Sequence, residues 1–218
     1  MHDEKALNEA RHWHSGKKIE ETLNSLRRNN MEGLYVENRE AALGEILKRI
    51  PPNATVSHGG SHTLQELGIN EILGKGEYRY LRRETPPNER EDHDVQIKSL
   101  SSDIYLTSVN AVTTAGELMA LDGIGNRVAC LLFGPRKVLV VAGKNKIVNS
   151  LDDGIRRIKE YVAPIHAKRR GWDLPCTKTG ICVECRDPKR ICNKLAILQY
   201  ERDRERITVI LVGEDLGI

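Results

Sequence analysis

The pattern of hydrophobic residues along this 218-residue chain predicts several buried strands. The clearest is Val138–Ala142, an unbroken apolar run typical of a strand that is buried on both faces of a parallel sheet. Ile104–Val109 and Ile207–Val212 also predict buried strands. Three shorter runs predict further strands, at Gly33–Glu37, Ala54–His58 and Tyr78–Leu81.

Between these runs, apolar residues recur at helical spacing. Three segments have this spacing: residues 4–29, which predict one or two amphipathic helices, residues 42–50 and residues 147–165. Two more helices are predicted from their starts, near Ser61–Thr63 and at Pro86-Pro87. Alternating strands and helices predict an α/β fold over residues 1–218, one domain with a mostly parallel open sheet and helices on both faces.

In an open parallel sheet, ligands bind beyond the carboxyl ends of the strands. Four predicted strands are followed by loops that carry glycine, hydroxyl, amide or charged groups. These loops are Ser57–Ser61, Asn110–Glu117, Gly143–Lys146 and Gly213–Asp215. The sequence therefore predicts a ligand site at this edge of the sheet.

The stretch that follows Ile104–Val109 contains the strongest candidates. Glu117 lies beside Gly116 between two apolar runs, where a carboxylate is placed to act as a base or nucleophile. The stretch ends in Asp122–Asn126, a turn rich in residues that tolerate positive φ. An ordinary strand, turn and hairpin explains the same residues, and the sequence leaves both interpretations open.

The segment His58–Ser61 is a candidate anion site. Its glycines let backbone N–H groups approach a ligand, and the predicted helix that follows adds a partial positive charge. His58 and His62 are candidate acid–base groups, and Lys144 and Lys146 are candidates for pairing with a carboxylate or phosphate. Ordinary polar loops are the alternative in each case.

Composition narrows the classes of function. With 39% hydrophobic and 30% charged residues, the chain can build a real core. A net charge of +3 and 4% aromatic residues argue against a general polyanion partner and against base stacking.

No apolar stretch approaches the ~20 residues that span a bilayer. The N-terminus lacks the apolar core of a signal peptide, so we expect a cytoplasmic protein with no membrane partner.

Three linked blocks of sequence resemble the LUD-domain proteins, the family of the lactate-utilisation C protein. The blocks lie within Ser57–Gly68, Ser108–Arg127 and Phe133–Lys146, and the resemblance covers nearly the whole chain. It implies the α/β fold shared by ribose-phosphate isomerase, glucosamine-phosphate deaminase and CoA transferases. It also implies a link to the oxidation of L-lactate to pyruvate with separate iron–sulfur subunits. The chemistry of the LUD domain itself is poorly defined.

Four of the five cysteines lie within 17 residues, in the pattern C-x5-C-x2-C-x6-C. They are Cys176, Cys182, Cys185 and Cys192. The central pair has the usual chelating spacing, so we expect the four to bind metal in a cysteine-rich insertion, residues 173–195, before the last strand. Cys130 lies apart in an apolar run and is expected in the core.

An iron–sulfur cluster of the 4Fe–4S type is the favoured cofactor, because four cysteine ligands suit it and the resembled family is linked to redox chemistry. Structural zinc is the alternative, and the spacing does not decide between the two metals. Disulfides are disfavoured in a cytoplasmic chain. A zinc-ribbon module for nucleic acid fits the local Lys/Arg excess, but the lack of interleaved aromatics argues against nucleic acid as a partner.

These observations predict a redox-linked metabolic protein that acts in the oxidation or utilisation of a small organic acid such as L-lactate. The expected partners are a small anionic metabolite, iron–sulfur redox subunits and, in a homo-oligomer, other copies of the chain. The alternatives are a sheet-edge enzyme like an isomerase or CoA transferase with structural zinc, and a non-enzymatic accessory subunit. The candidate catalytic residues are Glu117, Asn110, Asp122 and His58. The candidate residues for substrate or anion binding are Gly59, Gly60, Ser61, Thr113, Gly116, Asn126, Arg127 and Lys144.

Overall fold

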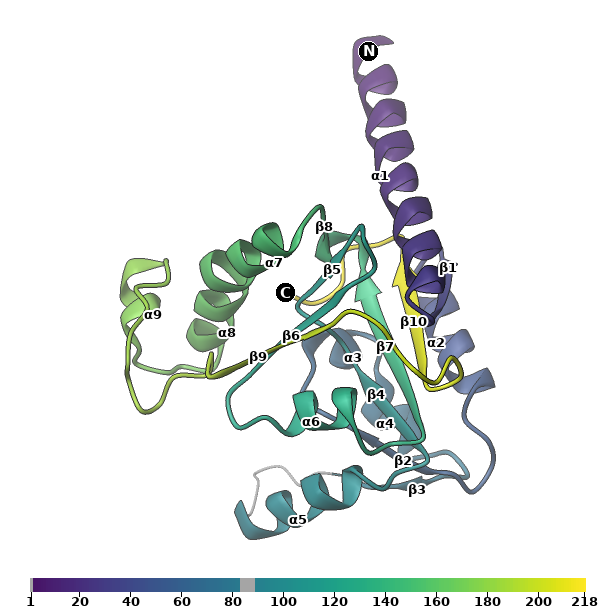
Figure 1. Cartoon of the computed structure of the whole chain (residues 1–218), viewed down its shortest axis with the longest axis vertical. Helices are drawn as coiled ribbons and strands as arrows, with labels where there is room; N and C mark the ends of the chain where they lie inside the picture. Colours follow the sequence, from purple (N-terminus) through teal and green to yellow (C-terminus); the bar gives the residue numbers. More distant parts are fainter. Residues whose placement is uncertain (1, 83–88) are drawn as a thin grey trace.

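The computed structural model describes residues 2–82 and 89–218, and its centre is a six-stranded parallel sheet (Figure 1). The strand order is β1-β10-β7-β4-β2-β3. The strands are β1 (Glu32–Val36), β2 (Thr55–His58), β3 (Arg79–Tyr80), β4 (Ile104–Thr107), β7 (Lys137–Gly143) and β10 (Ile207–Val212). Every pair in this sheet is parallel, which confirms the predicted mostly parallel α/β fold.

The three strands with the longest apolar runs occupy the middle of the sheet. All residues of β4 and β10 are buried, as are all residues of β7 after Lys137. Strands buried on both faces have no polar side to expose, which explains the absence of alternation in their sequences. β4 ends at Thr107, so Ser108 and Val109 already belong to the loop at the sheet edge.

Helices cover both faces of the sheet. One face packs on α2 (Arg39–Lys48), α3 (His62–Glu66) and α4 (Ile69–Leu73), through a core that includes Ile46, Leu64 and Val141. The other face packs on α1 (His2–Arg28) and α6 (Asn126–Leu132), through residues such as Leu26 and Leu131. The N-terminal part of α1 extends beyond the body of the molecule (Figure 1). A further helix, α5 (Glu89–Ser99), lies next to β2. The start predicted for this helix, at Pro86-Pro87, lies outside the described residues.

A second sheet, absent from the sequence-based prediction, covers part of the α1/α6 face. Its order is β8-β5-β6-β9, with β5 (Ala111–Thr113), β6 (Leu118–Asp122), β8 (Ile147–Val148) and β9 (Lys194–Leu198). β5 and β6 form the antiparallel hairpin that was the alternative interpretation of the Asn110–Glu117 loop. β9 follows the cysteine-rich segment, so this segment is separated from β10 by one further strand.

The predicted long helix is real, but its start at Ile147 is wrong. Ile147 and Val148 pair with β5 as strand β8, and the helix begins at Leu151 after Ser150, whose side chain accepts the Asp153 N–H. It then runs through α7 (Leu151–Arg157), the π-helical turn η2 (Ile158–Val162) and α8 (Ala163–Arg169). The π turn precedes Pro164, which has no N–H to continue the α-helical ladder.

The cysteine-rich segment, residues 173–195, contains one short helix, α9 (Pro175–Thr179), and otherwise no regular structure before β9 begins. It lies beside α8 at one end of the molecule (Figure 1). Within the described residues, no helix is both long and apolar enough to cross a membrane.

Candidate functional site

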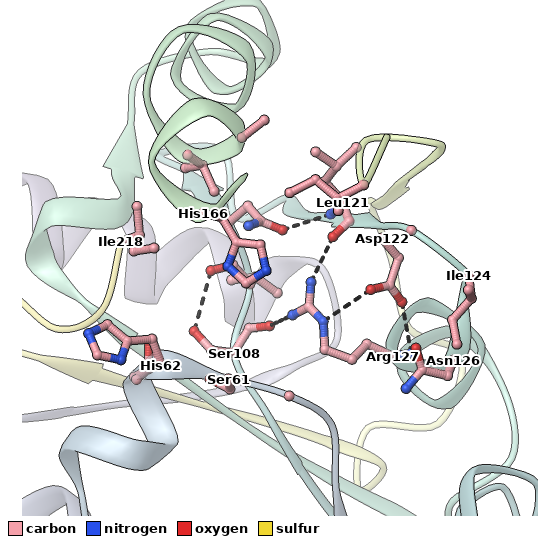
Figure 2. A pocket seen from close by; sticks show the side chains of 18 of the residues that line it. Ser61, His62, Ser108, Leu121, Asp122, Ile124, Asn126, Arg127, His166 and Ile218 are labelled. Carbon is pink, nitrogen blue, oxygen red and sulfur yellow. Dashed lines mark hydrogen bonds and ion pairs between the residues drawn. The ribbon is translucent and has the colours of Figure 1, made fainter. Parts of the chain in front are cut away.

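A cavity of about 310 Å³ lies at the edge where the neighbouring strands β2, β4 and β7 end (Figure 2). Because these strands are parallel, their carboxyl ends meet and the loops after them share the lining. These loops contribute Gly60–Thr63, Ser108–Asn110 and Lys146. Other walls come from the turn between β6 and α6, from η2 and α8, and from Ile191 of the cysteine-rich segment.

Lys146 is the most unusual residue of the cavity. It follows β7 in the 3-10 turn η1 (Lys144–Lys146) and is only 3% exposed. Its Nζ donates hydrogen bonds to Thr63 Oγ1 at 2.7 Å and to Ser108 Oγ at 2.8 Å. Both partners are neutral hydroxyls, so the positive charge of the ammonium group is not balanced by either of them.

The environment of Lys146 disfavours its charged form. Burial, and after it the charges of Arg157 and Arg127, together lower the pKa of Lys146 to about 7, while Glu66 acts in the opposite direction. The ammonium and the neutral amine are therefore both populated near neutral pH.

Arg127 is a second basic side chain in the cavity wall, and it forms an ion pair with Asp122 (Figure 2). Its Nε donates to Asp122 Oδ1 at 3.3 Å, its Nη1 to Ser108 O at 2.9 Å and its Nη2 to Leu121 O at 2.7 Å. Three anchoring bonds hold the planar guanidinium in one orientation, which suits recognition of a carboxylate.

Asp122 and Gly59 explain why Arg127 sits in this place. Asp122 Oδ2 accepts the backbone N–H of Arg127 at 2.8 Å and of Val128 at 3.1 Å, so it caps α6 where the N-cap residue, Gly125, has no side chain. Gly59 leaves space for the arginine stem, because a Cβ at residue 59 would lie 2.3 Å from Arg127 Cγ. Both residues therefore position Arg127.

His166 lines the cavity from α8 (Figure 2). Its ring packs edge-on against Trp172, with ring centroids 6.4 Å apart. Burial, and after it the charges of Arg169, Arg170 and Arg127, together lower the pKa of His166 to about 4. The imidazole is therefore neutral at pH 7. After burial, nearby cations are the next cause that lowers the pKa values of both His166 and Lys146.

Half of the candidate residues from the sequence line this cavity. They are Asn110, Asp122, Gly60, Ser61, Asn126 and Arg127. Besides Asp122, which caps α6, two more have structural roles: Asn110 Oδ1 accepts the Leu121 N–H at 2.7 Å, and Ser61 Oγ caps the five-residue helix α3 by accepting the Leu64 N–H. The remaining candidates, Gly59, His58, Glu117, Thr113, Gly116 and Lys144, are not among the lining residues.

Glu117 lies in the turn between β5 and β6. Its Oε2 accepts a hydrogen bond from Thr113 Oγ1 at 3.0 Å and its Oε1 accepts one from Gln199 Nε2 at 3.0 Å. Gly116 completes this turn with φ of 81° and packs directly on the end of α1, since a Cβ there would lie 2.7 Å from Leu26 N. This geometry is that of a turn held against a helix.

His58 and Lys144 also lie outside the lining of the cavity. His58 Nε2 is 2.6 Å from Tyr80 Oη, and the two rings are stacked with centroids 5.7 Å apart. Lys144 is exposed and borders a separate hollow along α1, together with Tyr35 and Gly213. His62, at the start of α3, does line the cavity, and its Nε2 lies 3.2 Å from Glu66 Oε1.

All five cysteines have free thiols, and Cys130 is buried as expected. The other four are partly exposed. Burial raises the pKa of the Cys176 thiol, and so do Cys185, Cys192 and Cys182, which places the four thiols in one neighbourhood. Within the described residues, no three His, Cys, Asp or Glu side chains converge on a common point as metal ligands would.

The sequence-based candidates did not include several residues of this cavity. Thr63 and Ser108 belong to the sequence blocks quoted above, and their placement after β2 and β4 is a usable signal. Lys146 is a sequence candidate only jointly with Lys144, because nothing in the sequence shows which of the two lysines is buried. His166 and Trp172 carry no local signal, since their place depends on where the long helix packs.

Comparison with protein-family models matches residues 19–212 to the model described as LUD domain. Among solved structures, the chain is similar to a DUF162 family protein from Deinococcus radiodurans, whose crystal structure was determined at 1.70 Å resolution. The two share 15% sequence identity with a TM-score of 0.55, over 91% of this chain and 98% of that chain. At this identity the likeness shows the fold. The comparison with curated proteins gives no match.

Proposed function

The chain belongs to the LUD-domain family, and from this premise we propose that it acts in the utilisation of a small organic acid such as L-lactate. In this proposal the acid, or its 2-oxo product, binds in the cavity at the sheet edge. The four cysteines hold a metal centre of the 4Fe–4S type next to it.

The observation that carries the proposal is the pair of basic side chains, Arg127 and Lys146, that line the cavity. Arg127 is fixed in its wall, and Lys146 has hydroxyl partners only. A bound carboxylate would supply an opposite charge, which neither Thr63 nor Ser108 provides to Lys146. The volume of about 310 Å³ is at the lower end of the range for ligand pockets, which suits a small acid better than a CoA ester.

The donor set of the cysteine-rich segment fits a metal centre. Four thiolates around a metal leave a net negative charge, and Arg190 lies among them, since Cys192 and Cys185 both raise its pKa. Arg190 Nε is buried without a hydrogen-bond partner within the described part of the chain. An N–H···S bond to a thiolate or sulfide would supply that partner.

The cavity and the cysteine-rich segment are in contact. Ile191 lines the cavity one residue before Cys192, and its backbone would lie 3.6 Å from a Cβ at Gly123. If the four cysteines hold a redox cluster, that cluster supplies a one-electron carrier beside the bound acid. Arg127 and Lys146 bind and orient the acid.

Two measurements test the proposal. Metal analysis and an absorption spectrum of anaerobically purified protein are expected to show iron with broad visible absorption. Calorimetric titrations are expected to show binding of L-lactate or pyruvate and much weaker binding of lactamide, which has the same shape without the charge. A colourless protein that contains zinc would refute the iron–sulfur assignment and would show that the metal centre is structural. Equal binding of lactate and lactamide would refute the carboxylate site.

The alternative of an isomerase- or CoA-transferase-like enzyme has less support from the site. It relied on Glu117 as base or nucleophile, and this carboxylate is hydrogen-bonded in a turn outside the cavity. Binding of a sugar phosphate or a CoA ester in place of lactate in the same titrations would favour that alternative.

A further inference from the structure

The amine of Lys146 has a chemical capacity that anion binding does not use. Within the described residues, Lys146 is the buried lysine, and no carboxylate lies within ion-pair distance of its Nζ. Its hydrogen bonds hold Nζ between the hydroxyls of Thr63 and Ser108, and all three residues line the cavity. A lysine used for structure alone is normally paired with a carboxylate or exposed at its charged end.

The groups around Lys146 come from four elements. Arg157 lies on α7, Arg127 on α6 and Glu66 on α3. Burial and the two arginines lower the pKa of Lys146, and they outweigh Glu66, which raises it. His166 on α8 also lines the cavity and is neutral at pH 7. Desolvation and nearby cations keep part of the lysine population neutral and nucleophilic at physiological pH, as in lysines that react with carbonyl groups.

We infer that Lys146 forms a reversible covalent imine with the carbonyl carbon of a small 2-oxo acid in this cavity. The choice of a 2-oxo acid rests on the proposed function, because oxidation of a 2-hydroxy acid such as lactate yields one. Arg127 is placed to hold the carboxylate while the carbonyl carbon meets Nζ.

The step is balanced without any further reactant. The lone pair of the neutral Lys146 Nζ forms a bond to the carbonyl carbon as the C=O π bond breaks, and one Nζ proton is transferred to the carbonyl oxygen to give a carbinolamine. The C–O bond then breaks, the oxygen leaves as water with the second Nζ proton, and the nitrogen lone pair forms the C=N bond. The hydroxyls of Thr63 and Ser108 lie 2.7 and 2.8 Å from Nζ, where they can relay these protons. Addition of water reverses the step.

The test is reductive trapping. The full-length protein is incubated with pyruvate and sodium borohydride, and its intact mass and peptide map are recorded. One reduced pyruvyl adduct per chain, located on Lys146, is expected. The matched control is Lys137→Met, an exposed lysine at the opposite end of β7, which should keep the adduct. Lys146→Met should lose it, and Lys146→Arg serves as a second variant that keeps a positive charge but forms no stable adduct.

The outcomes separate this inference from the proposed function. Calorimetric binding of pyruvate without a trapped adduct overturns the imine and leaves the carboxylate site intact. Adducts spread over exposed lysines, or an adduct that persists in Lys146→Met, also overturn the imine. Absence of both binding and adduct refutes the proposed function as well. Circular dichroism of each variant shows that a lost adduct does not come from a lost fold.

Discussion

The cavity at the sheet edge and the cysteine-rich segment are neighbours, yet different forces hold them in place. The loops of the cavity extend from β4 and β7, whose side chains are almost all buried. In residues 173–195 only Leu174 is buried, while Ile181 and Val183 are largely exposed. Hydrophobic burial thus positions the cavity, whereas the segment has too little burial to offset an ordering entropy of ~1–2 kcal/mol per residue.

The same contrast appears in the hydrogen bonds. Arg127 is anchored to groups on rigid elements of the core. Arg190 is bound to the carbonyl oxygens of Cys185 and Cys192 within its own segment. These two bonds are local, and other contacts join the segment to the rest of the protein, such as the Asn193 N–H bond to Asp122 O at 3.0 Å and the ion pair of Glu184 with Lys159. We therefore expect metal ligation to provide the missing stabilisation of the segment.

The largest effect is expected from breaking the metal site. Cys182→Ser or Cys185→Ser should release the metal and make residues 173–195 sensitive to proteases, because ligation worth ~10–16 kcal/mol in structural zinc sites is lost. The sheet should stay folded. Metal content and limited proteolysis measure both effects. In the control, Cys130→Ala changes a core residue and should keep the metal; loss of metal there, or its retention in the other two variants, contradicts the assignment.

The second prediction concerns pH and the buried amine of Lys146. Its folded-state pKa of about 7 lies below its ordinary value of 10.5, so between these values the unfolded chain binds the extra proton. The free energy of unfolding should therefore rise with pH over this window, by up to about 5 kcal/mol, and this rise should shrink in Lys146→Met. Urea unfolding at several pH values measures it. If the free energy of unfolding of Lys146→Met rises equally steeply with pH, groups other than Lys146 cause the rise.

The third prediction tests how tightly the core positions Arg127. Gly59→Ala places a Cβ 2.3 Å from Arg127 Cγ and 2.6 Å from Tyr105 Oη. Overpacking of this kind should cost about 1–3 kcal/mol and weaken pyruvate binding. The matched control is Gly16→Ala in α1, where nothing in the described chain lies within 4 Å of the new Cβ. That change should stabilise the protein by about 1 kcal/mol and leave binding unchanged.

The smallest effect is expected at Glu117. Glutamine can accept the same hydrogen bond from Thr113, and the turn lies outside the lining of the cavity. Glu117→Gln should therefore change the free energy of unfolding by less than about 0.5 kcal/mol and leave pyruvate affinity unchanged. A large loss of affinity or activity in this variant would restore Glu117 as a catalytic candidate and would shift the site away from Lys146.

The sequence predicted the parts of the fold that burial determines. Val138–Ala142 and Ile207–Val212 have no polar face, so their place in the middle of a parallel sheet follows from their composition. Ile147-Val148 and Ala111–Thr113 were not recognised as strands, because such short segments acquire their structure from pairing with each other. Their apolar residues fit a helical or loop pattern equally well.

The sequence predicted the part of the candidate site that is built from the loops after the parallel strands. The loops after β2, β4 and β7 do meet, and they bring Ser61, Asn110 and Lys146 to one cavity. The burial of Lys146 was not predictable, because it depends on contacts with Thr63 and Ser108, which are distant in sequence. The position of His166 depends on the packing of α8, which periodicity alone does not determine.

The most direct test of the account is the affinity of pyruvate for three proteins: wild type, Lys137→Met and Lys146→Met. Affinities are measured by calorimetry at about pH 6, where Lys146 is mostly charged, so that a change in its protonation does not contribute to the measured binding. We predict equal affinity for wild type and Lys137→Met. For Lys146→Met we predict a loss of about tenfold or more, because a hydrogen bond to a charged group contributes ~1.5–3 kcal/mol. Equal affinity of all three proteins, or no binding to any of them, would contradict the central claim that this cavity binds a small organic acid through Lys146.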